Sequence, residues 1–251
     1  MRNLHNHLSR PENFKIYNLL CVIYVFLMIM SNIFSTKLIS INGFTVTGAF
    51  LMYPITYVLN FIISEIYGYK NARRCIHYVM ITFLCFILSI KILLILPASE
   101  HWKHQSSLES LFGLQTRVFI ASLIAFATST FISSYILQKL KKRTKGAYLF
   151  IRIIFSLLIL EMLDTCLFCF LAFYNIWDID KMMKFFVLSY LIKLLYEVTI
   201  YPFITAPLIT KIKKIEKLDI LDTSTNFNPL LMDTNYDDSN NLYKKSYLRS
   251  I

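Results

Sequence analysis

Six long apolar segments, separated by short polar stretches, dominate the hydropathy pattern of the 251-residue chain. They run from about 16 to 35, 48 to 67, 75 to 96, 116 to 137, 147 to 173 and 182 to 209. A helix needs about 20 apolar residues to cross the hydrocarbon core of a bilayer. Because backbone groups in lipid need internal partners, and no strand pattern competes, the sequence predicts an all-α, polytopic membrane protein with a bundle of six transmembrane helices.

Composition and charge support this class. Hydrophobic residues make up 56% of the chain and charged residues 16%, whereas soluble domains are about 45–50% apolar and about 25% charged. The net charge of +11 does not indicate a nucleic-acid partner, because the basic residues form short clusters between apolar segments. The expected surroundings are therefore a lipid bilayer.

The basic clusters also predict the orientation. They precede the first segment and follow the second, fourth and sixth, whereas the other loops carry few lysines or arginines. Cytoplasmic loops carry an excess of these residues, so both termini are expected in the cytoplasm. We predict a cytoplasmic segment at 1–15, a six-helix transporter domain at 16–210 and a polar tail at 211–251. The tail has no apolar periodicity, so we expect it to be largely disordered and without a role in transport.

The fifth segment carries two carboxylates in its apolar middle. Glu161, Asp164, Thr165 and Phe168 follow the spacing i, i+3, i+4, i+7, so they share one helix face. One charged side chain at the bilayer centre costs about 2.5–3.5 kcal/mol on insertion scales. The face is therefore expected to line a polar cavity inside the bundle.

Other polar residues in the apolar segments allow more than one interpretation. Lys193 and Glu197 in the sixth segment either neutralise each other at i, i+4, or Lys193 pairs with Asp164 or Glu161 across the bundle. Glu65 is either a solvated acid at a helix end or part of an ion pair. Arg117 and Arg152 are candidates for gating or ion pairing. Alternatively, their side chains extend to the lipid headgroups.

The sequence shows no constellation typical of an enzyme. It contains no H-E-x-x-H sequence, no phosphate-binding loop and no G-x-S-x-G sequence. We therefore expect no catalytic residues, no metal site and no cofactor.

Residues spread over the apolar segments suggest a family. In chain order they are Ser31-Asn32, Gly48-Ala49-Phe50, Pro54, Glu65-x-Tyr67-Gly68-x-x-x-Ala72-Arg73-Arg74, Arg117-x-x-x-Ala121-Ser122-x-x-Ala125-Phe126, Arg152-x-x-x-Ser156, Leu163-Asp164-Thr165-x-x-Phe168, Tyr190-Leu191-x-Lys193 and Pro202. Together they resemble the bacterial queuosine precursor transporters, also called the vitamin uptake transporter or YhhQ-like family. The resemblance covers about 32 to 202.

The resemblance implies a bacterial inner-membrane protein that imports 7-cyano- and 7-aminomethyl-7-deazaguanine for the synthesis of queuosine in tRNA. Three positions depart from the family pattern. Phe61 stands where an Asp is usual, Thr130 replaces a Gln, and Tyr201 replaces a Thr. The choice among purine-like bases is therefore open, and Asn60 is a partial substitute for the missing acid.

A deazaguanine presents its ring N–H and exocyclic amine as donors, which one carboxylate can accept in a strong, charge-assisted pair. We expect Asp164 to be that carboxylate, with Glu161 as second choice, and Lys193 to neutralise Asp164 in the empty site. Asn32 is expected at the carbonyl edge of the base. The rings expected to stack on it are Phe168, Tyr57 and Phe50.

Three alternatives stay open at this point. The acids could serve only to hold helices together through ion pairs. Transport could be coupled to protons or be facilitated diffusion. The chain could also be the substrate-capture subunit of a multi-component importer, with accessory energising subunits docking on a stripe of small residues at 121, 122, 125 and 129, which could equally be an internal packing seam. A homo-oligomer stays open as well.

Overall fold

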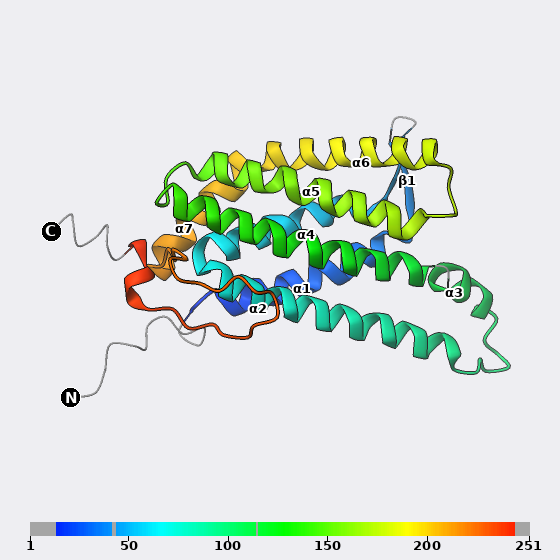
Figure 1. The fold of residues 1–251 in the computed structure, drawn as a ribbon. Coiled ribbons are helices and arrows are strands. Elements are labelled where there is room, and N and C mark those ends of the chain that lie inside the picture. Colours follow the sequence, from blue (N-terminus) through cyan, green and yellow to red (C-terminus); the bar gives the residue numbers. More distant parts are fainter. Residues whose placement is uncertain (1–13, 42–43, 114, 244–251) are drawn as a thin grey trace.

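Long apolar helices run side by side along the molecule (Figure 1). The computed structural model describes residues 14–41, 44–113 and 115–243. The main helices are α1 (Tyr17–Phe34), α2 (Tyr53–Ile95), α4 (Gln115–Arg143), α5 (Leu149–Phe173) and α6 (Ile179–Ile200). Helix α4 packs along both α5 and α2, while α1 packs on α2 and α6 on α5.

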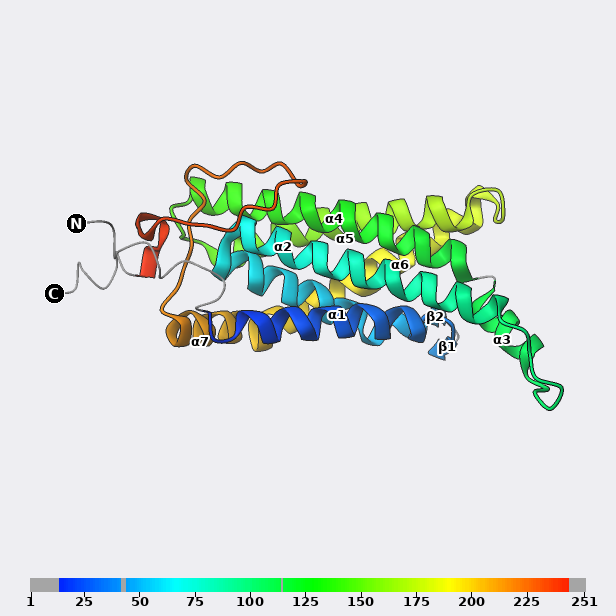
Figure 2. The ribbon, with the colours of Figure 1, turned by 90° about the horizontal axis from the view of Figure 1, so that it is seen from below.

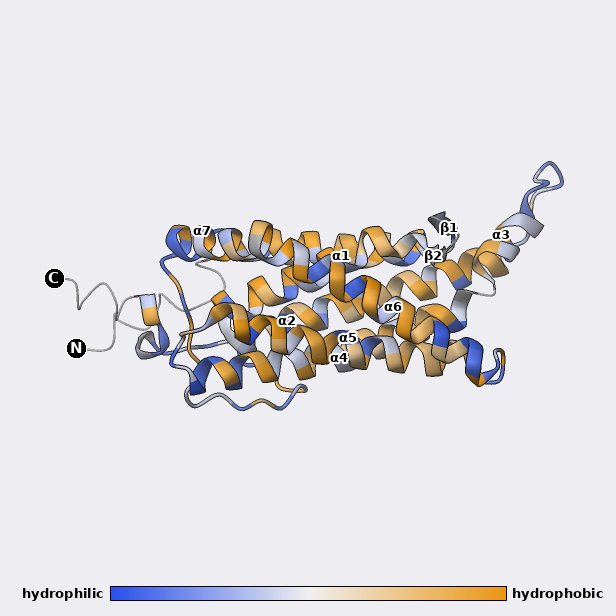
Figure 3. Ribbon diagram, turned by 90° about the horizontal axis from the view of Figure 1, so that it is seen from above, coloured by the Kyte–Doolittle hydropathy of each residue, from blue (hydrophilic) through white to orange (hydrophobic). Residues whose placement is uncertain are grey.

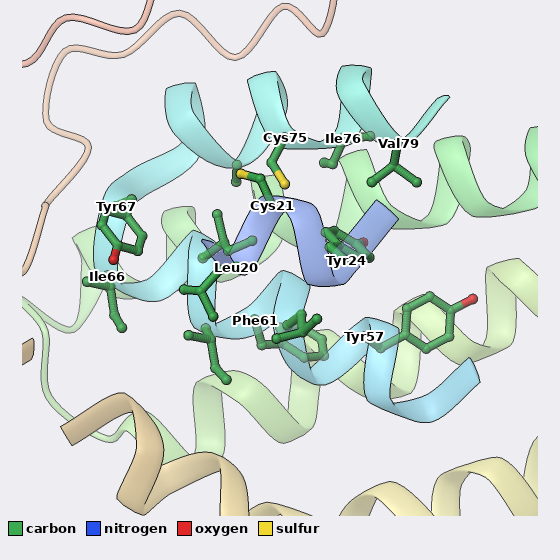
Figure 4. Close-up of a cluster of buried hydrophobic side chains, with 14 of the residues drawn as sticks. Leu20, Cys21, Tyr24, Tyr57, Phe61, Ile66, Tyr67, Cys75, Ile76 and Val79 are labelled. Carbon is green, nitrogen blue, oxygen red and sulfur yellow. The ribbon is translucent and has the colours of Figure 1, made fainter. Parts of the chain in front are cut away.

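Helix α2 is divided in two at Gly68, which has φ 78° and ψ 173°. Positive φ is disfavoured for residues with a side chain, and here a Cβ would also lie 2.6 Å from the hydroxyl of Tyr236. The two halves turn back on each other and hold α1 between them through a core that includes Leu20, Cys21 and Tyr24 (Figure 4). The apolar segments predicted at 48–67 and 75–96 fall on these two halves.

The outer surface of the bundle is apolar. Within the described residues, five helical stretches are long and apolar enough to cross a membrane, namely Tyr17–Phe34, Gly48–Ile95, Gln105–Arg143, Leu149–Phe173 and Ile179–Glu216. Large exposed side chains follow their outer faces, among them Phe26, Leu88, Ile124, Phe155 and Leu195. Figure 3 shows hydrophobic residues along most of each helix, with hydrophilic ones at the two ends and at a few places in the middle of the bundle. The chain is a multi-pass membrane protein.

The loop after α1 contains strands that the sequence pattern did not predict. Strands β1 (Leu38–Ile41) and β2 (Phe44–Thr47) pair antiparallel, with Leu38 opposite Thr47. A 3₁₀ turn, η2 (Gly48–Leu51), then leads into α2. The fold remains all-helical in class, and this short hairpin is a local addition whose β-branched residues favour extended backbone. A short helix, α3 (Gln105–Phe112), precedes α4 on the same side (Figure 2).

The sixth apolar segment is interrupted near its end, where it contains Pro202 and Pro207. Helix α6 passes into a π-helical turn, η3 (Tyr201–Thr205), and then into α7 (Ala206–Glu216). The end of α7 meets the start of α1, where the Ile16 amide donates to Glu216 at 2.7 Å. Both ends of the described chain therefore lie at one end of the bundle, opposite the β1–β2 hairpin (Figure 1).

The C-terminal tail is folded onto the bundle as far as the structure describes it. The Ile220 amide donates to the Ile66 carbonyl at 3.0 Å, and Asp222 accepts from the Tyr69 amide at 2.9 Å. The Lys70 amide donates to the hydroxyl of Tyr236 at 2.9 Å. The expectation of a largely disordered tail is wrong for 217–243, because these residues supply the backbone partners that the break at Gly68 leaves free. A short 3₁₀ turn, η4 (Asp238–Asn240), lies within it.

Candidate functional site

A cavity of about 370 Å³ lies among α1, α2, α4, α5 and α6, in the half of the bundle next to the β1–β2 hairpin. This volume is in the usual range for small-molecule sites, about 300–1,000 Å³. Its lining also includes residues at helix ends and in the hairpin, among them Thr36, Thr47 and Trp177. Asp164 and Lys193, from the middle of α5 and α6, form part of its wall.

Asp164 and Lys193 form an ion pair at the cavity. The Lys193 Nζ donates to Asp164 Oδ2 at 3.0 Å and to the Thr165 hydroxyl at 3.5 Å. Asp164 is 2% exposed, and its other oxygen, Oδ1, has no partner among the described residues. The Lys193 ammonium also lies 5.0 Å from the centre of the Tyr53 ring. The sequence left two partners open for Lys193, and the structure shows the pair across the bundle.

Two further carboxyl groups lie directly behind this pair. Glu161 Oε2 is 3.4 Å from the Lys193 Nζ, and Glu161 itself is fully buried. Glu197, one turn after Lys193, is 3% exposed, and its carboxyl faces that of Glu161. Neither glutamate lines the cavity. The residues predicted on one face of α5 are thus divided between the cavity wall and a buried layer behind it.

Asn32 on α1 contributes a polar group to the opposite wall. One N–H of its amide donates to the Met28 carbonyl at 3.0 Å, and the residue is nearly buried. Near it, the Tyr53 and Ser122 hydroxyls lie 3.5 Å apart. Ser31, Ser35 and Ser189 add hydroxyls to the lining. The cavity therefore carries a few polar groups on largely apolar walls, the usual composition of a small-molecule site.

Aromatic rings form much of the remaining wall. Phe50 and Phe168, both predicted for stacking, line the cavity. Sequence reasoning missed three more rings, from Phe173, Trp177 and Phe185. Phe173 and Trp177 stack with centroids 3.8 Å apart, and Phe185 packs against both edge to face. Phe173 lies about half a turn around α5 from Asp164, and Trp177 lies past the end of that helix, so the helical spacing gave no signal for either ring.

Two predicted site residues lie elsewhere. Tyr57 is fully buried next to Tyr53 with ring centroids 5.2 Å apart, and does not line the cavity. Asn60 lies deeper along α2, where its Oδ1 accepts from the Ser134 hydroxyl at 3.3 Å. The three side chains that depart from the family pattern, Phe61, Thr130 and Tyr201, are also buried and do not line the cavity.

Glu65 is the centre of a second charged cluster, at the end of the bundle where the described termini lie. Arg152 of α5 donates to its two oxygens at 2.7 and 3.1 Å. Lys213 of α7 lies 2.8 Å and Lys141 of α4 3.4 Å from Glu65 Oε1. Both lysines also contact Asp219 of the tail, at 2.9 and 2.6 Å. Of the alternatives for Glu65 and Arg152, the structure shows the buried ion pair.

Arg117 belongs to neither cluster. Its guanidinium donates to the carbonyls of Leu171 and Tyr174 at 2.9 and 2.7 Å, at an exposed position near the end of α5. Among the described residues, no group of three or more His, Cys, Asp or Glu side chains has the geometry of a metal site.

Comparison with known proteins gives the family. Residues 47–206, more than half of the chain, match a family model described as "Putative vitamin uptake transporter". The chain belongs to this family. One similar curated protein is the "Probable queuosine precursor transporter" of Bacillus subtilis (strain 168), 28% identical over 170 residues, which cover 67% of this chain and 74% of that protein. No solved structure matches the chain.

The residues that match the family model include much of both charged clusters. Asp164, Lys193, Glu65 and Arg152 all lie within 47–206. Asn32 and the whole of α1 precede the match, and α7 and the tail lie beyond it apart from Ala206, the first residue of α7.

Proposed function

We propose that this protein is a transporter of the bacterial inner membrane that imports queuosine precursors, 7-cyano- or 7-aminomethyl-7-deazaguanine. The observation that carries the proposal is the Asp164–Lys193 pair in the wall of an aromatic cavity. Membership in a transporter family and the similarity to a protein named for queuosine precursor transport support it.

The cavity offers complementary groups for a flat, polar base. Asp164 Oδ1 has no partner within the described part of the chain, so it can accept from the ring N–H or the exocyclic amine of the substrate. The positive charge of Lys193 neutralises Asp164 in the empty site. When the base is bound, the Lys193 ammonium can donate a hydrogen bond to its carbonyl. The base would stack on Phe50 or Phe168. A site of this kind rejects analogues that leave its buried groups unpaired.

The same proposal includes six membrane crossings, one for each half of α2, with both termini in the cytoplasm. The domain boundaries proposed are 1–15, 16–210 and 211–251. In that orientation the cavity opens toward the outside, next to the hairpin, and the Glu65–Arg152 cluster closes the cytoplasmic end. Import requires this cluster to separate or shift so that the base can leave. Arg117, at the outer end, is proposed to hold the α4–α5 contact there.

The stripe of small residues that the sequence suggested as a docking face for a partner subunit is not on the surface. Ala121, Ser122, Ala125 and Ser129 are all buried inside the bundle, at 4% exposure or less. Small residues there let α4 approach its neighbours closely. An autonomous carrier is therefore the function that we propose.

The test is complementation of a bacterium that lacks its own precursor importer. The protein should restore queuosine in tRNA when 7-cyano- or 7-aminomethyl-7-deazaguanine is supplied externally, and free queuine serves as a third compound. No restoration with any of the three by protein that is present in the membrane contradicts the proposed substrate. Restoration only with a co-expressed ATPase favours the capture subunit.

A further inference from the structure

The charged cluster formed by the cavity wall and the buried layer behind it contains more acids than bases. Three carboxyl groups, those of Glu161, Asp164 and Glu197, surround the single ammonium of Lys193, and none of the three acids is more than 3% exposed. Lys193 lies 3.0 Å from Asp164 and 3.4 Å from Glu161. If all three acids were ionised, the cluster would carry two uncompensated negative charges in the middle of the bundle, which is strongly unfavourable.

Glu161 and Glu197 are paired with the ammonium less closely than Asp164 is. Their carboxyl groups face each other across α5 and α6. None of their four oxygens has a hydrogen bond of good geometry among the described residues, although the Lys193 Nζ lies 3.4 Å from Glu161 Oε2. A hydrogen bond between two carboxyl groups requires a proton on one of them, as in any closely spaced pair of buried acids.

The other titratable groups facing the cluster do not supply the missing charge. From α2 they are Tyr53 and Tyr57, from α5 Cys169, and from α6 Tyr190. Phenols and thiols are neutral at pH 7 at their ordinary pKa values. The Tyr57 hydroxyl is fully buried, has no partner among the described residues, and lies near Asp164 and Glu161. The Tyr57 hydroxyl is therefore a neutral hydrogen-bond donor that can turn toward whichever carboxylate becomes negatively charged.

From this arrangement we infer that the Glu161–Glu197 pair is a proton-binding site that couples substrate import to proton movement. The inference rests on the proposed function and deepens it by naming the coupling ion. The pair touches Lys193 on one side, and Lys193 touches the proposed substrate ligand Asp164 on the other. Lys193 therefore links the proton site to the substrate site. When the glutamate pair loses its proton, its negative charge attracts the Lys193 ammonium, and Asp164 is then free to bind the base.

The first test needs no substrate. Infrared spectra of the purified full-length protein at pH 7 should show the carbonyl absorption of a protonated carboxylic acid. That absorption should disappear in Glu197→Gln or Glu161→Gln, and persist in Glu109→Gln, an exposed control on α3. Because glutamine has the shape of a protonated glutamate, both variants should fold. A spectrum of the native protein in which neither glutamate contributes such a band overturns the proton site.

The second test separates coupling from transport. In proteoliposomes, exchange of labelled for unlabelled 7-cyano-7-deazaguanine needs no driving ion, whereas net accumulation does. Glu197→Gln should retain exchange and lose the accumulation driven by an inward proton gradient. Accumulation that ignores the gradient, or follows sodium instead, overturns the inference while leaving the substrate in place. Absence of exchange by the native protein contradicts the substrate, and the infrared result still decides the proton site.

Discussion

Lys193 on α6 reaches across to Asp164 on α5 and donates to it at 3.0 Å, although the two residues are far apart in the sequence. The pair links the helices that form one side of the cavity. Removing one partner of a buried ion pair leaves an uncompensated charge and typically costs about 3–5 kcal/mol. Lys193→Met should therefore lower the free energy of unfolding in detergent by about that amount.

The double variant Asp164→Asn/Lys193→Met separates folding from transport. It removes both charges of the pair, so most of the lost stability should return, while uptake should stay absent. Lys184→Met, at an exposed position of α6, is the matched control. Thermal unfolding followed by fluorescence measures the recovery of stability, and complementation measures uptake. Full uptake by the double variant would mean that the pair serves only to hold helices together.

The Glu65–Arg152 pair predicts a distinct effect at the other end of the bundle. Arg152 contacts both oxygens of Glu65 at once, which lysine cannot reproduce. Arg152→Lys should lower the unfolding temperature and increase access of a thiol reagent to a cysteine placed near Glu65 from the cytoplasmic side. Arg143→Lys, exposed at the end of α4, should change neither. Unchanged access in a stable Arg152→Lys protein would show that this cluster is not a barrier.

Gly68 should tolerate no side chain. Alanine there would adopt a positive φ and place its Cβ within 3 Å of Tyr236 and Ile220. Backbone strain of this kind costs about 1–3 kcal/mol. Gly68→Ala should therefore reduce the unfolding temperature and loosen the tail, while Ser89→Ala on the exposed face of the same helix should not. Equal stability of the two variants would contradict the backbone conformation at 68.

The tail should detach from the bundle in acid. Burial raises the pKa of the Asp233 carboxyl, but hydrogen bonds from Lys70 and Arg73 outweigh it and hold that pKa below its usual range. The stabilisation is therefore present above the unfolded-state value of about 4 and is lost as the pH falls below it. Pepsin should cleave the tail faster as the pH falls through this window.

Asp233→Asn should abolish most of that pH dependence, because an amide does not titrate there. Tyr236 supplies a check that does not depend on acid. Burial and the nearby Asp222 raise its pKa, so its hydroxyl stays protonated and donates to that carboxylate at 2.6 Å. Tyr236→Phe should release the tail at neutral pH at a cost of about 1–3 kcal/mol, whereas Tyr148→Phe, at an exposed position, should not.

The long helices were predictable because each depends on local composition alone. The apolar segments predicted the positions of α1, both halves of α2, α4 and α5, and the interruption before α7 lies next to Pro202 and Pro207. The hairpin was missed, although β-branched residues flank an Asn-Gly pair at 42–43, two residues that lie outside the described structure. The tail was missed because its order depends on partners at the Gly68 break, which no local pattern reveals.

The candidate site was predictable only in part. Buried charge is costly in a bilayer, so Asp164, Glu161 and Lys193 stood out in the sequence, and the structure brings them together. Which acid faces the cavity depends on the rotation of α5, and spacing alone did not separate Asp164 from Glu161. The contribution of Phe185 depends on how α6 packs against α5, so its sequence position carried no signal.

Uptake of labelled 7-cyano-7-deazaguanine by cells that express Asp164→Asn tests the central claim most directly. Charged hydrogen bonds are worth about 1.5–3 kcal/mol, so uptake at low substrate should fall by about tenfold to a hundredfold. The protein level in the membrane should stay normal, and Asp180→Asn, an exposed acid in the first turn of α6, should transport like the native protein. Normal uptake by Asp164→Asn would contradict the assignment of this carboxylate to the substrate.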